Sequence, residues 1–186
     1  NAKIVLGVSA GIAVYKAVEI LRLLVKEGAD VRVVMSANAS KFVTPLTFEA
    51  LSGNPVYHSL FDSHNSAQME HIRVAENADL LVVAPATASM LGKMAHGLAA
   101  DALSNLHLAF KGSVLVAPAM NDGMWEHPAV KKNIDILRSR GVDFVDPAFG
   151  ELACGVTGPG LLAEPSAILD KVRSYFNQRD DLNGIR

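Results

Sequence analysis

One stretch organises this sequence: Val116-Ala117-Pro118-Ala119-Met120-Asn121-Asp122-Gly123-Met124-Trp125. The apolar run 113–117 predicts a buried strand, and Pro118 ends it because proline has no backbone N–H to donate. Asn121 follows directly, with Met124 and the only tryptophan, Trp125, close behind. Ligands of an open parallel sheet bind beyond the carboxyl ends of its strands. We therefore expect Asn121 to enter a ligand crevice with bulky apolar neighbours, although an ordinary Asn-Asp-Gly turn is compatible with the same residues.

Length and composition restrict the class of protein. The 186 residues suit one domain with a substantial core, and a half-hydrophobic, aromatic-poor composition is typical of a parallel sheet covered on both faces. A net charge of −2 without a basic block argues against a nucleic-acid partner. Cys154 is the only cysteine, which excludes an internal disulfide and fits a reducing compartment. With no signal peptide and no apolar run of membrane-spanning length, we expect a cytoplasmic protein without a membrane partner.

Apolar strand-like runs alternate with segments of helical periodicity along the whole chain. Strands are predicted at 3–8, 31–35, 78–84, 113–117 and 142–145. Helices are predicted from the turn at 9–12 to about 26, from 45 to 52, and over 88–96, 101–110, 129–138 and 165–176. This alternation predicts an α/β fold, a Rossmann-like doubly wound parallel sheet of five or six strands in a single domain. The domain covers 1–176, and 177–186 is a polar tail or the start of a linker.

Small and hydroxyl residues follow two further strands. Gly7, Ser9 and Gly11 surround the first turn, where a helix begins, and free N–H groups at a helix start suit a phosphate. The pattern is not the dinucleotide fingerprint, since no acidic residue closes the second strand, and a plain tight turn explains it equally well. Thr87 and Ser89 follow the third strand and either cap a helix or bind a phosphate. Three such strand ends together predict a crevice suited to a mononucleotide such as FMN.

Four segments, in this order, match a known family: residues 7–13, residues 84–88, the motif Pro118-x-Met120-Asn121-x-x-Met124-Trp125, and Ala153-Cys154-Gly155. They resemble the homo-oligomeric flavin-containing cysteine decarboxylases, and within them the branch that acts on 4′-phosphopantothenoylcysteine in coenzyme A biosynthesis. The resemblance runs from residue 3 to about 176, and the Pro-x-Met-Asn-x-x-Met-Trp motif is its most specific part. Ala10 departs from the pattern, since many members carry a glycine there.

The resemblance implies FMN as cofactor and a small-molecule substrate. The residues implied near FMN are Ser9, Gly11, Ser36, Thr87 and Ser89. The implied catalytic residues are His71 as an active-site histidine, Asn121 as the holder of the substrate carboxylate, and Cys154 as a proton donor on a flap. Met124 and Ala153 are expected to contact the substrate beside Asn121, and no metal is expected. The family further implies a homotrimer or homododecamer, with a synthetase domain following in bifunctional members.

The chemistry explains why a flavin is expected. Loss of CO₂ from an N-acylcysteine leaves a carbanion without an electron sink, and a flavin creates one by taking a hydride from Cβ of the thiolate. The glycine- and proline-rich segment 147–160 contains Cys154 and is predicted to be the flap. Without the family pattern, Cys154 would be a small buried hydrophobe and His71 one of six ordinary histidines. The other five, at 58, 64, 96, 107 and 127, show no metal-binding spacing.

Three rival functions remain open at this point. A flavin prenyltransferase is expected to lack the pair Asn121 and Cys154, which is present. A peptidyl-cysteine decarboxylase performs only the first half of the chemistry and has no need for the reduction that Cys154 serves. A non-catalytic flavin-fold regulatory subunit is expected to lose part of the catalytic set and to carry long charged extensions.

Overall fold

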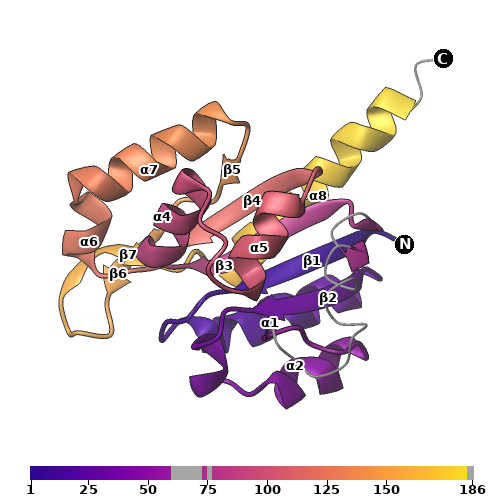
Figure 1. The fold of residues 1–186 in the computed structure, drawn as a ribbon, viewed down its shortest axis with the longest axis horizontal. Coiled ribbons are helices and arrows are strands. Elements are labelled where there is room, and N and C mark those ends of the chain that lie inside the picture. The colour runs from indigo at the N-terminus through magenta and orange to yellow at the C-terminus, as the bar shows by residue number, and fades with distance from the viewer. Residues whose placement is uncertain (60–72, 75–76, 184–186) are drawn as a thin grey trace.

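The computed structural model describes residues 1–59, 73–74 and 77–183, with side chains up to residue 178. Its centre is a sheet of five parallel strands: β1 (Lys3–Val8), β2 (Asp30–Met35), β3 (Leu80–Ala86), β4 (Ser113–Pro118) and β5 (Asp143–Phe144). The strand order is β2-β1-β3-β4-β5 (Figure 1). The predicted α/β fold with a doubly wound parallel sheet is confirmed.

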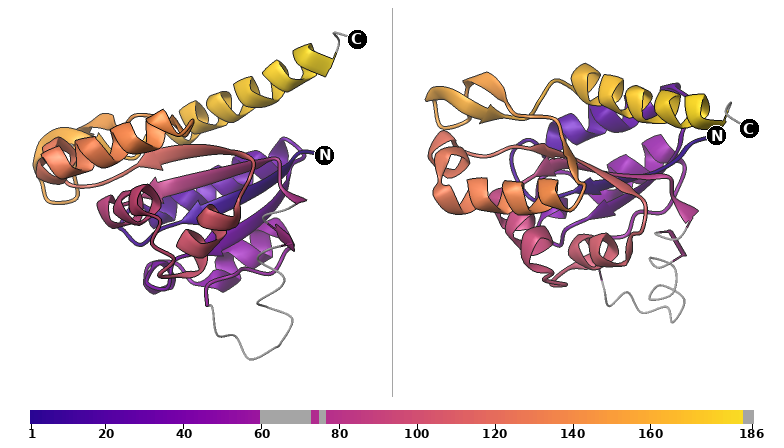
Figure 2. Two further views of the ribbon diagram at one scale, coloured as in Figure 1. Left: turned by 45° about the horizontal axis from the view of Figure 1, so that its top comes forward. Right: turned by 90° about the horizontal axis from the view of Figure 1, so that it is seen from above.

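Helices cover both faces of this sheet. They are α1 (Val14–Lys26), α2 (Pro45–Ser52), α4 (Ala88–His96), α5 (Ala102–Ala109), α6 (Asp122–Glu126), α7 (Pro128–Ser139) and α8 (Pro165–Asn183), with a short 3-10 turn η1 (Ala39–Lys41). Figure 2 shows α1 and α8 on one side of the sheet and α4, α5 and α7 on the other. None of the helices in the described part of the chain has the length and apolar character needed to cross a bilayer.

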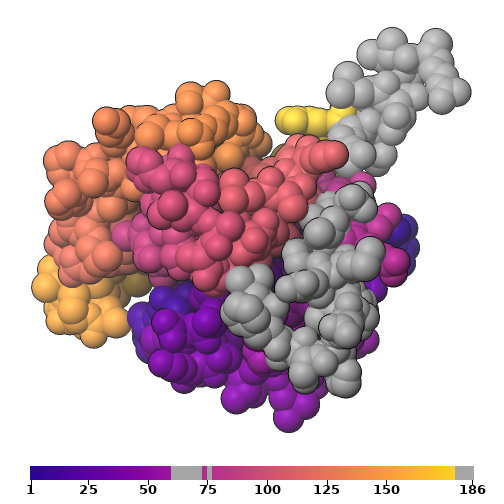
Figure 3. Space-filling view, viewed as in Figure 1, coloured from indigo at the N-terminus to yellow at the C-terminus, as the bar shows by residue number. Residues whose placement is uncertain are grey.

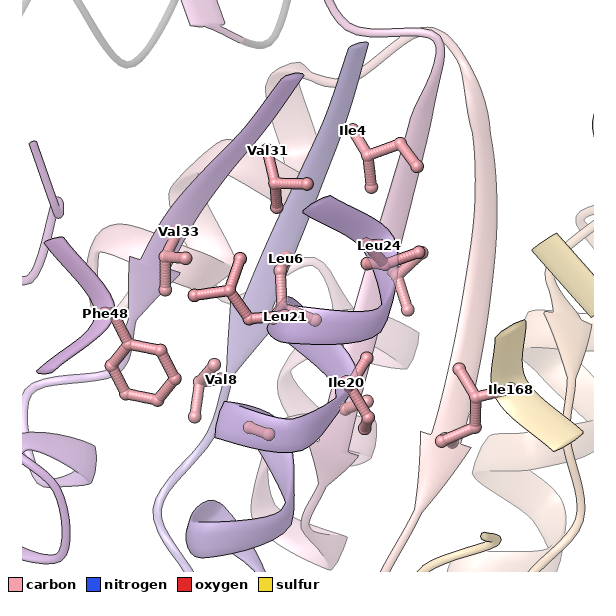
Figure 4. Packing of buried hydrophobic residues seen from close by; sticks show 14 of the residues in the cluster. Ile4, Leu6, Val8, Ile20, Leu21, Leu24, Val31, Val33, Phe48 and Ile168 are labelled. Atoms are coloured by element: carbon pink, nitrogen blue, oxygen red, sulfur yellow. The ribbon is translucent and has the colours of Figure 1, made fainter. Parts of the chain in front are cut away.

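Alternation along the central strands divides the core into two clusters. In β4, Leu115 and Ala117 face the first cluster, whereas Val114 and Val116 face the second. Figure 4 shows part of the first cluster, where strand residues meet α1, α2 and α8: Ile4, Leu6, Val8, Ile20, Leu21, Leu24, Val31, Val33, Phe48 and Ile168. Burial on both faces explains why these strands are continuous apolar runs in the sequence.

The strand order fixes where a ligand crevice belongs. The chain goes from β1 outward to β2 and then crosses to β3 on the other side of β1. The carboxyl ends of β1 and β3 therefore flank the switch point of the sheet, where ligands of open α/β folds bind. Both ends carry the small and hydroxyl residues singled out in the sequence.

Three elements have a form that the sequence analysis did not specify or placed differently. The glycine-rich flap is an antiparallel hairpin of β6 (Ala148–Glu151) and β7 (Thr157–Leu161), because its strands pair with each other outside the main sheet. Asn121-Asp122-Gly123, which is also compatible with an ordinary turn, opens a short helix, α6. Finally, α8 continues to Asn183 instead of ending near residue 176, since no glycine or proline interrupts the polar residues before Gly184.

Candidate active site

A pocket of about 480 Å³ lies at the carboxyl edge of the sheet, and four segments line it. Its walls come from residues 10–13 after β1, residues 85 and 87–89 at the start of α4, residues 119–121 and 124 after β4, and residues 152–154 and 160–162 of the hairpin. None of these lining residues carries a formal charge. A mostly apolar pocket of this size with a few polar groups is typical of a small-molecule or cofactor site.

Ser9 joins the two strand ends beneath this pocket. Its side chain is buried, and its Oγ donates a hydrogen bond to the carbonyl oxygen of Pro85 at 2.6 Å. The same Oγ accepts one from the backbone N–H of Thr87 at 2.9 Å. Ser9 does not line the pocket. The two hydrogen bonds of its hydroxyl instead hold the start of α4 in place against the end of β1.

Two helix starts meet at the pocket, and they differ in capping. Thr87 caps α4 by accepting a hydrogen bond from the N–H of Met90 at 3.2 Å, and Thr87 and Ser89 both line the pocket. The first residue before α1, Ala13, makes no side-chain cap, and Gly11 lines the pocket one turn earlier. The N–H groups of Val14 and Lys16 already donate to the carbonyl oxygens of Gly11 and Ala13. The positive end of the α1 dipole still favours an anionic ligand group beside Gly11.

Ser36 lies at the carboxyl end of β2, outside the pocket wall. It is only 7% exposed, and its Oγ has no hydrogen-bond partner among the described residues. A buried hydroxyl without a partner is destabilising by about 1–3 kcal/mol. A polar ligand group at this edge of the sheet would satisfy it.

Asn121 divides its two polar atoms between structure and site. Its Oδ1 caps α6 by accepting a hydrogen bond from the N–H of Met124 at 3.3 Å. Its Nδ2 donates to Cys154 Sγ over 3.9 Å, within the pocket. Because capping already uses the oxygen, the side chain presents its N–H₂ group, the donor that a carboxylate requires.

The hairpin docks closely onto the segment before Asn121. The N–H of Met120 donates to the carbonyl oxygen of Gly160 at 2.9 Å. Gly160 has a φ of +132°, and a Cβ there would lie 2.1 Å from the carbonyl oxygen of Met120. Only glycine permits both the backbone angle and this approach.

At the hairpin tip, a turn closed by Leu152 and Val156 presents the exposed thiol of Cys154. Figure 3 shows the hairpin as a projecting edge at the lower left of the molecule.

The structure thus brings together Gly11, Thr87, Ser89, Asn121, Met124, Ala153 and Cys154 around one pocket. Ser9 lies beneath it and Ser36 apart from it, whereas His71 lies outside the described residues. Gly160 was missed by sequence reasoning, because a positive φ and a backbone contact leave no mark in a glycine-rich segment. The functional roles of the site residues predicted from the sequence stay predictions.

Two titratable groups outside the pocket have pKa values that are shifted by their structural surroundings. Burial raises the pKa of Asp101, but hydrogen bonds from Lys93 and Ser104 outweigh it and hold that pKa below its usual value. Burial, with Arg140 nearby, lowers the pKa of His107. In the part of the chain that the structure describes, no three His, Cys, Asp or Glu side chains gather closely enough to hold a metal ion.

Comparison with known proteins gives four consistent matches, which are a family model, a curated relative and two solved structures. A family model described as flavoprotein matches residues 1–177. The coenzyme A biosynthesis bifunctional protein CoaBC of Bacillus subtilis (strain 168) is 47% identical over 176 residues, which are 95% of this chain and 43% of that protein. The chain therefore spans less than half the length of this curated relative.

Two solved structures have the same fold over nearly their whole length. A mutant of PPC decarboxylase complexed with pantothenoylaminoethenethiol is 29% identical, with a TM-score of 0.84, over 95% of this chain and 99% of that one. The FMN-binding protein AtHal3 is 30% identical, with a TM-score of 0.80, over 95% of this chain and 97% of that one.

Proposed function

This chain belongs to the flavoprotein family, and we propose that it decarboxylates 4′-phosphopantothenoylcysteine to 4′-phosphopantetheine in coenzyme A biosynthesis, with FMN as cofactor. The observation that carries the proposal is the meeting of Asn121 and Cys154 in a pocket at the switch point of the sheet. The names of the relatives, a bifunctional coenzyme A biosynthesis protein and a PPC decarboxylase, support the same substrate.

The residues present fit FMN. The start of α1 and the hydroxyls of Thr87 and Ser89 at the pocket are groups that suit a phosphate and a ribityl chain. Ser36, apart from the pocket, adds a buried hydroxyl that has no partner among the described residues. The uncharged pocket walls suit a flat, largely apolar ring. When bound, FMN supplies the reversible two-electron chemistry that makes the substrate's carboxylate a leaving group.

Asn121 holds the substrate carboxylate in this proposal. Its Nδ2 faces the pocket, where the described walls carry no cation. A cation would stabilise the carboxylate of the ground state and oppose loss of CO₂, whereas an amide orients the group without a full charge.

Cys154 provides the proton that completes the product. The hairpin carries its thiol to the mouth of the pocket, 3.9 Å from Asn121 Nδ2. After CO₂ leaves, the carbon that carried it needs a proton, and the Cys154 thiol is the proposed donor. His71 is proposed to assist deprotonation of the substrate thiol, because an imidazole can accept a proton and release it again.

We also propose that the protein works as a homotrimer or homododecamer in the cytoplasm, with a synthetase domain following this chain in the full-length protein. Ile12, which lines the pocket, and Tyr15 beside it are 61% and 59% exposed, which suits burial against a second subunit. The relative's greater length supports the fusion. Light scattering of the purified chain tests the assembly: a mass three or twelve times that of the monomer is expected.

The proposed function is tested by FMN titration followed by CO₂ release from two substrates in parallel. The protein is expected to bind FMN with an altered visible spectrum and to release CO₂ from 4′-phosphopantothenoylcysteine. A peptide ending in cysteine is the comparison substrate. Preference for the peptide would replace the proposal with peptidyl-cysteine decarboxylation, and a flavin-loaded protein inactive on both would indicate a regulatory role.

A further inference from the structure

Lys131 lies over the ring of Trp125, which is the only tryptophan of the chain. Its Nζ is 4.1 Å from the ring centroid, within the range of a cation–π interaction. The two residues come from adjacent helices, Trp125 from α6 and Lys131 from α7. The same ammonium lies 3.6 Å from a carboxylate oxygen of Glu126 on α6. One side chain of α7 thus makes two contacts with α6.

Helix α6 needs such contacts because it is short and buries little of its own surface. It is five residues long and contains no fully buried residue. Isolated helices of this length are not stable in water. Trp125 is its apolar residue packed against the second core cluster. Asp122 lies close to the hairpin, since a Cβ added at Gly158 would come within 3.0 Å of the Asp122 Cβ.

Helix α7, in contrast, is firmly anchored. Val130, Ile134 and Leu137 are buried on one face of it, and Pro128 and a His127 cap define its start. Lys131 therefore extends from a fixed element, and Trp125 belongs to the element that needs fixing.

The position of α6 determines the direction of Asn121. The carbonyl oxygen of Asn121 accepts from the N–H of Trp125 at 2.9 Å, and its Oδ1 accepts from the N–H of Met124 at 3.3 Å. A tilt of α6 would move both N–H donors, draw the side chain of Asn121 with them and rotate its Nδ2 away from the pocket. The ring of Trp125 and the amide of Asn121 are thus coupled through one helical turn.

We propose that Lys131 is a positioning residue, whose ammonium over the Trp125 ring fixes α6 against α7 and thereby directs Asn121 Nδ2 into the pocket. The inference rests on the proposed function for the role of Asn121 as carboxylate holder. Its structural half, the fixing of α6, stands on the contacts of Lys131 alone.

The test uses FMN-loaded protein with Lys131→Met, which keeps the apolar stem and a helix-forming residue but removes the charge. Lys131→Arg restores a cation over the ring, and Lys132→Met removes a neighbouring exposed lysine as the matched control. The first measurement is acrylamide quenching of the single tryptophan. The second is KM and kcat for 4′-phosphopantothenoylcysteine.

In Lys131→Met we expect stronger quenching and a KM raised about two- to fivefold, with kcat changed by less than about twofold, from the size of one partly exposed cation–π contact. Lys131→Arg is expected to return both values toward those of the wild type, and Lys132→Met to leave both unchanged. Unchanged quenching in Lys131→Met would overturn the proposal. So would altered quenching with an unaltered KM, because Lys131 would then fix α6 without directing Asn121. A wild-type protein that binds FMN but does not release CO₂ would instead overturn the proposed function, and quenching alone would then decide the fixing of α6.

Discussion

Asn121 Nδ2 and Cys154 Sγ lie 3.9 Å apart although 33 positions separate the two residues in the sequence. One follows the end of β4 and the other sits at the tip of the β6–β7 hairpin. The backbone contact between Met120 and Gly160 holds the hairpin close enough for this meeting. The proposed carboxylate holder and the proposed proton donor are therefore positioned by the same docking.

Asn121→Asp separates the two functions of that side chain. Aspartate is an equally good helix cap, so α6 is expected to form as before. The donor toward the pocket is lost, and a negative charge would face the substrate carboxylate. We expect KM to rise at least about tenfold with the thermal midpoint nearly unchanged. Asn133→Asp on α7 is the control, and an equal rise in its KM would contradict a specific role for Asn121.

Gly160→Ala is expected to displace the hairpin. The new Cβ would meet the carbonyl oxygen of Met120 at 2.1 Å, so one of the two segments has to move. A misplacement of about 1 Å at an active site can reduce the rate about a hundredfold. We therefore expect kcat/KM of Gly160→Ala to fall by more than about tenfold. Gly92→Ala in α4 is the matched change, because its nearest neighbour lies 3.6 Å away. Equal activity of the two variants would refute the docking argument.

Ser9→Ala tests the joint between β1 and the start of α4. The change removes the donor to Pro85 and the acceptor for the N–H of Thr87 in a buried place. We expect a loss of about 1–3 kcal/mol in the free energy of unfolding, measured from urea midpoints. Ser40→Ala removes an exposed hydroxyl and is expected to change stability by less than about 0.5 kcal/mol. If Ser9→Ala lowered the free energy of unfolding no more than Ser40→Ala does, the hydroxyl of Ser9 would not join β1 to the start of α4.

Asp101 gives a pH-dependent prediction. It caps α5 through Ser104 and pairs with Lys93, and these bonds hold its folded pKa below the ordinary 3.8 despite burial. Its ionised form therefore favours the folded state above about pH 3.8, and this stabilisation disappears as pH falls through the folded pKa. The wild type is expected to be more stable than Asp101→Asn at pH 7, with the difference shrinking below about pH 4. Urea midpoints of both proteins between pH 7 and 3 measure this stability difference. A difference that stays constant over this range would contradict a lowered pKa of Asp101 in the folded state.

The fold was largely predictable because its strands are buried on both faces. The apolar runs of β1 and β4 have the predicted bounds to within one residue, and α4 begins and ends where Thr87 and Gly97 indicate. These signals are local, since they depend on burial and capping at the residues themselves.

The hairpin, the short helix α6 and the positions of Ser9 and Gly160 depend on contacts between segments that are distant in the sequence. The hairpin strand 157–161 contains two glycines and a proline, so its extended form comes from pairing and docking, not from strand propensity. The short helix α6 is similarly held by Trp125 and its neighbours. At the site, motif order singled out Asn121 and Cys154, but no local pattern indicated that Ser9 would join two strand ends or that Gly160 would dock on Met120.

The most direct test of the account is the mass of the product formed anaerobically from 4′-phosphopantothenoylcysteine by the FMN-loaded protein. The account predicts a product lighter than the substrate by CO₂ alone, and a Cys154→Ser variant whose product is two hydrogens lighter still. A wild-type product that also lacks those two hydrogens would contradict it, because the protein would then stop at oxidative decarboxylation and Cys154 would not complete the reaction.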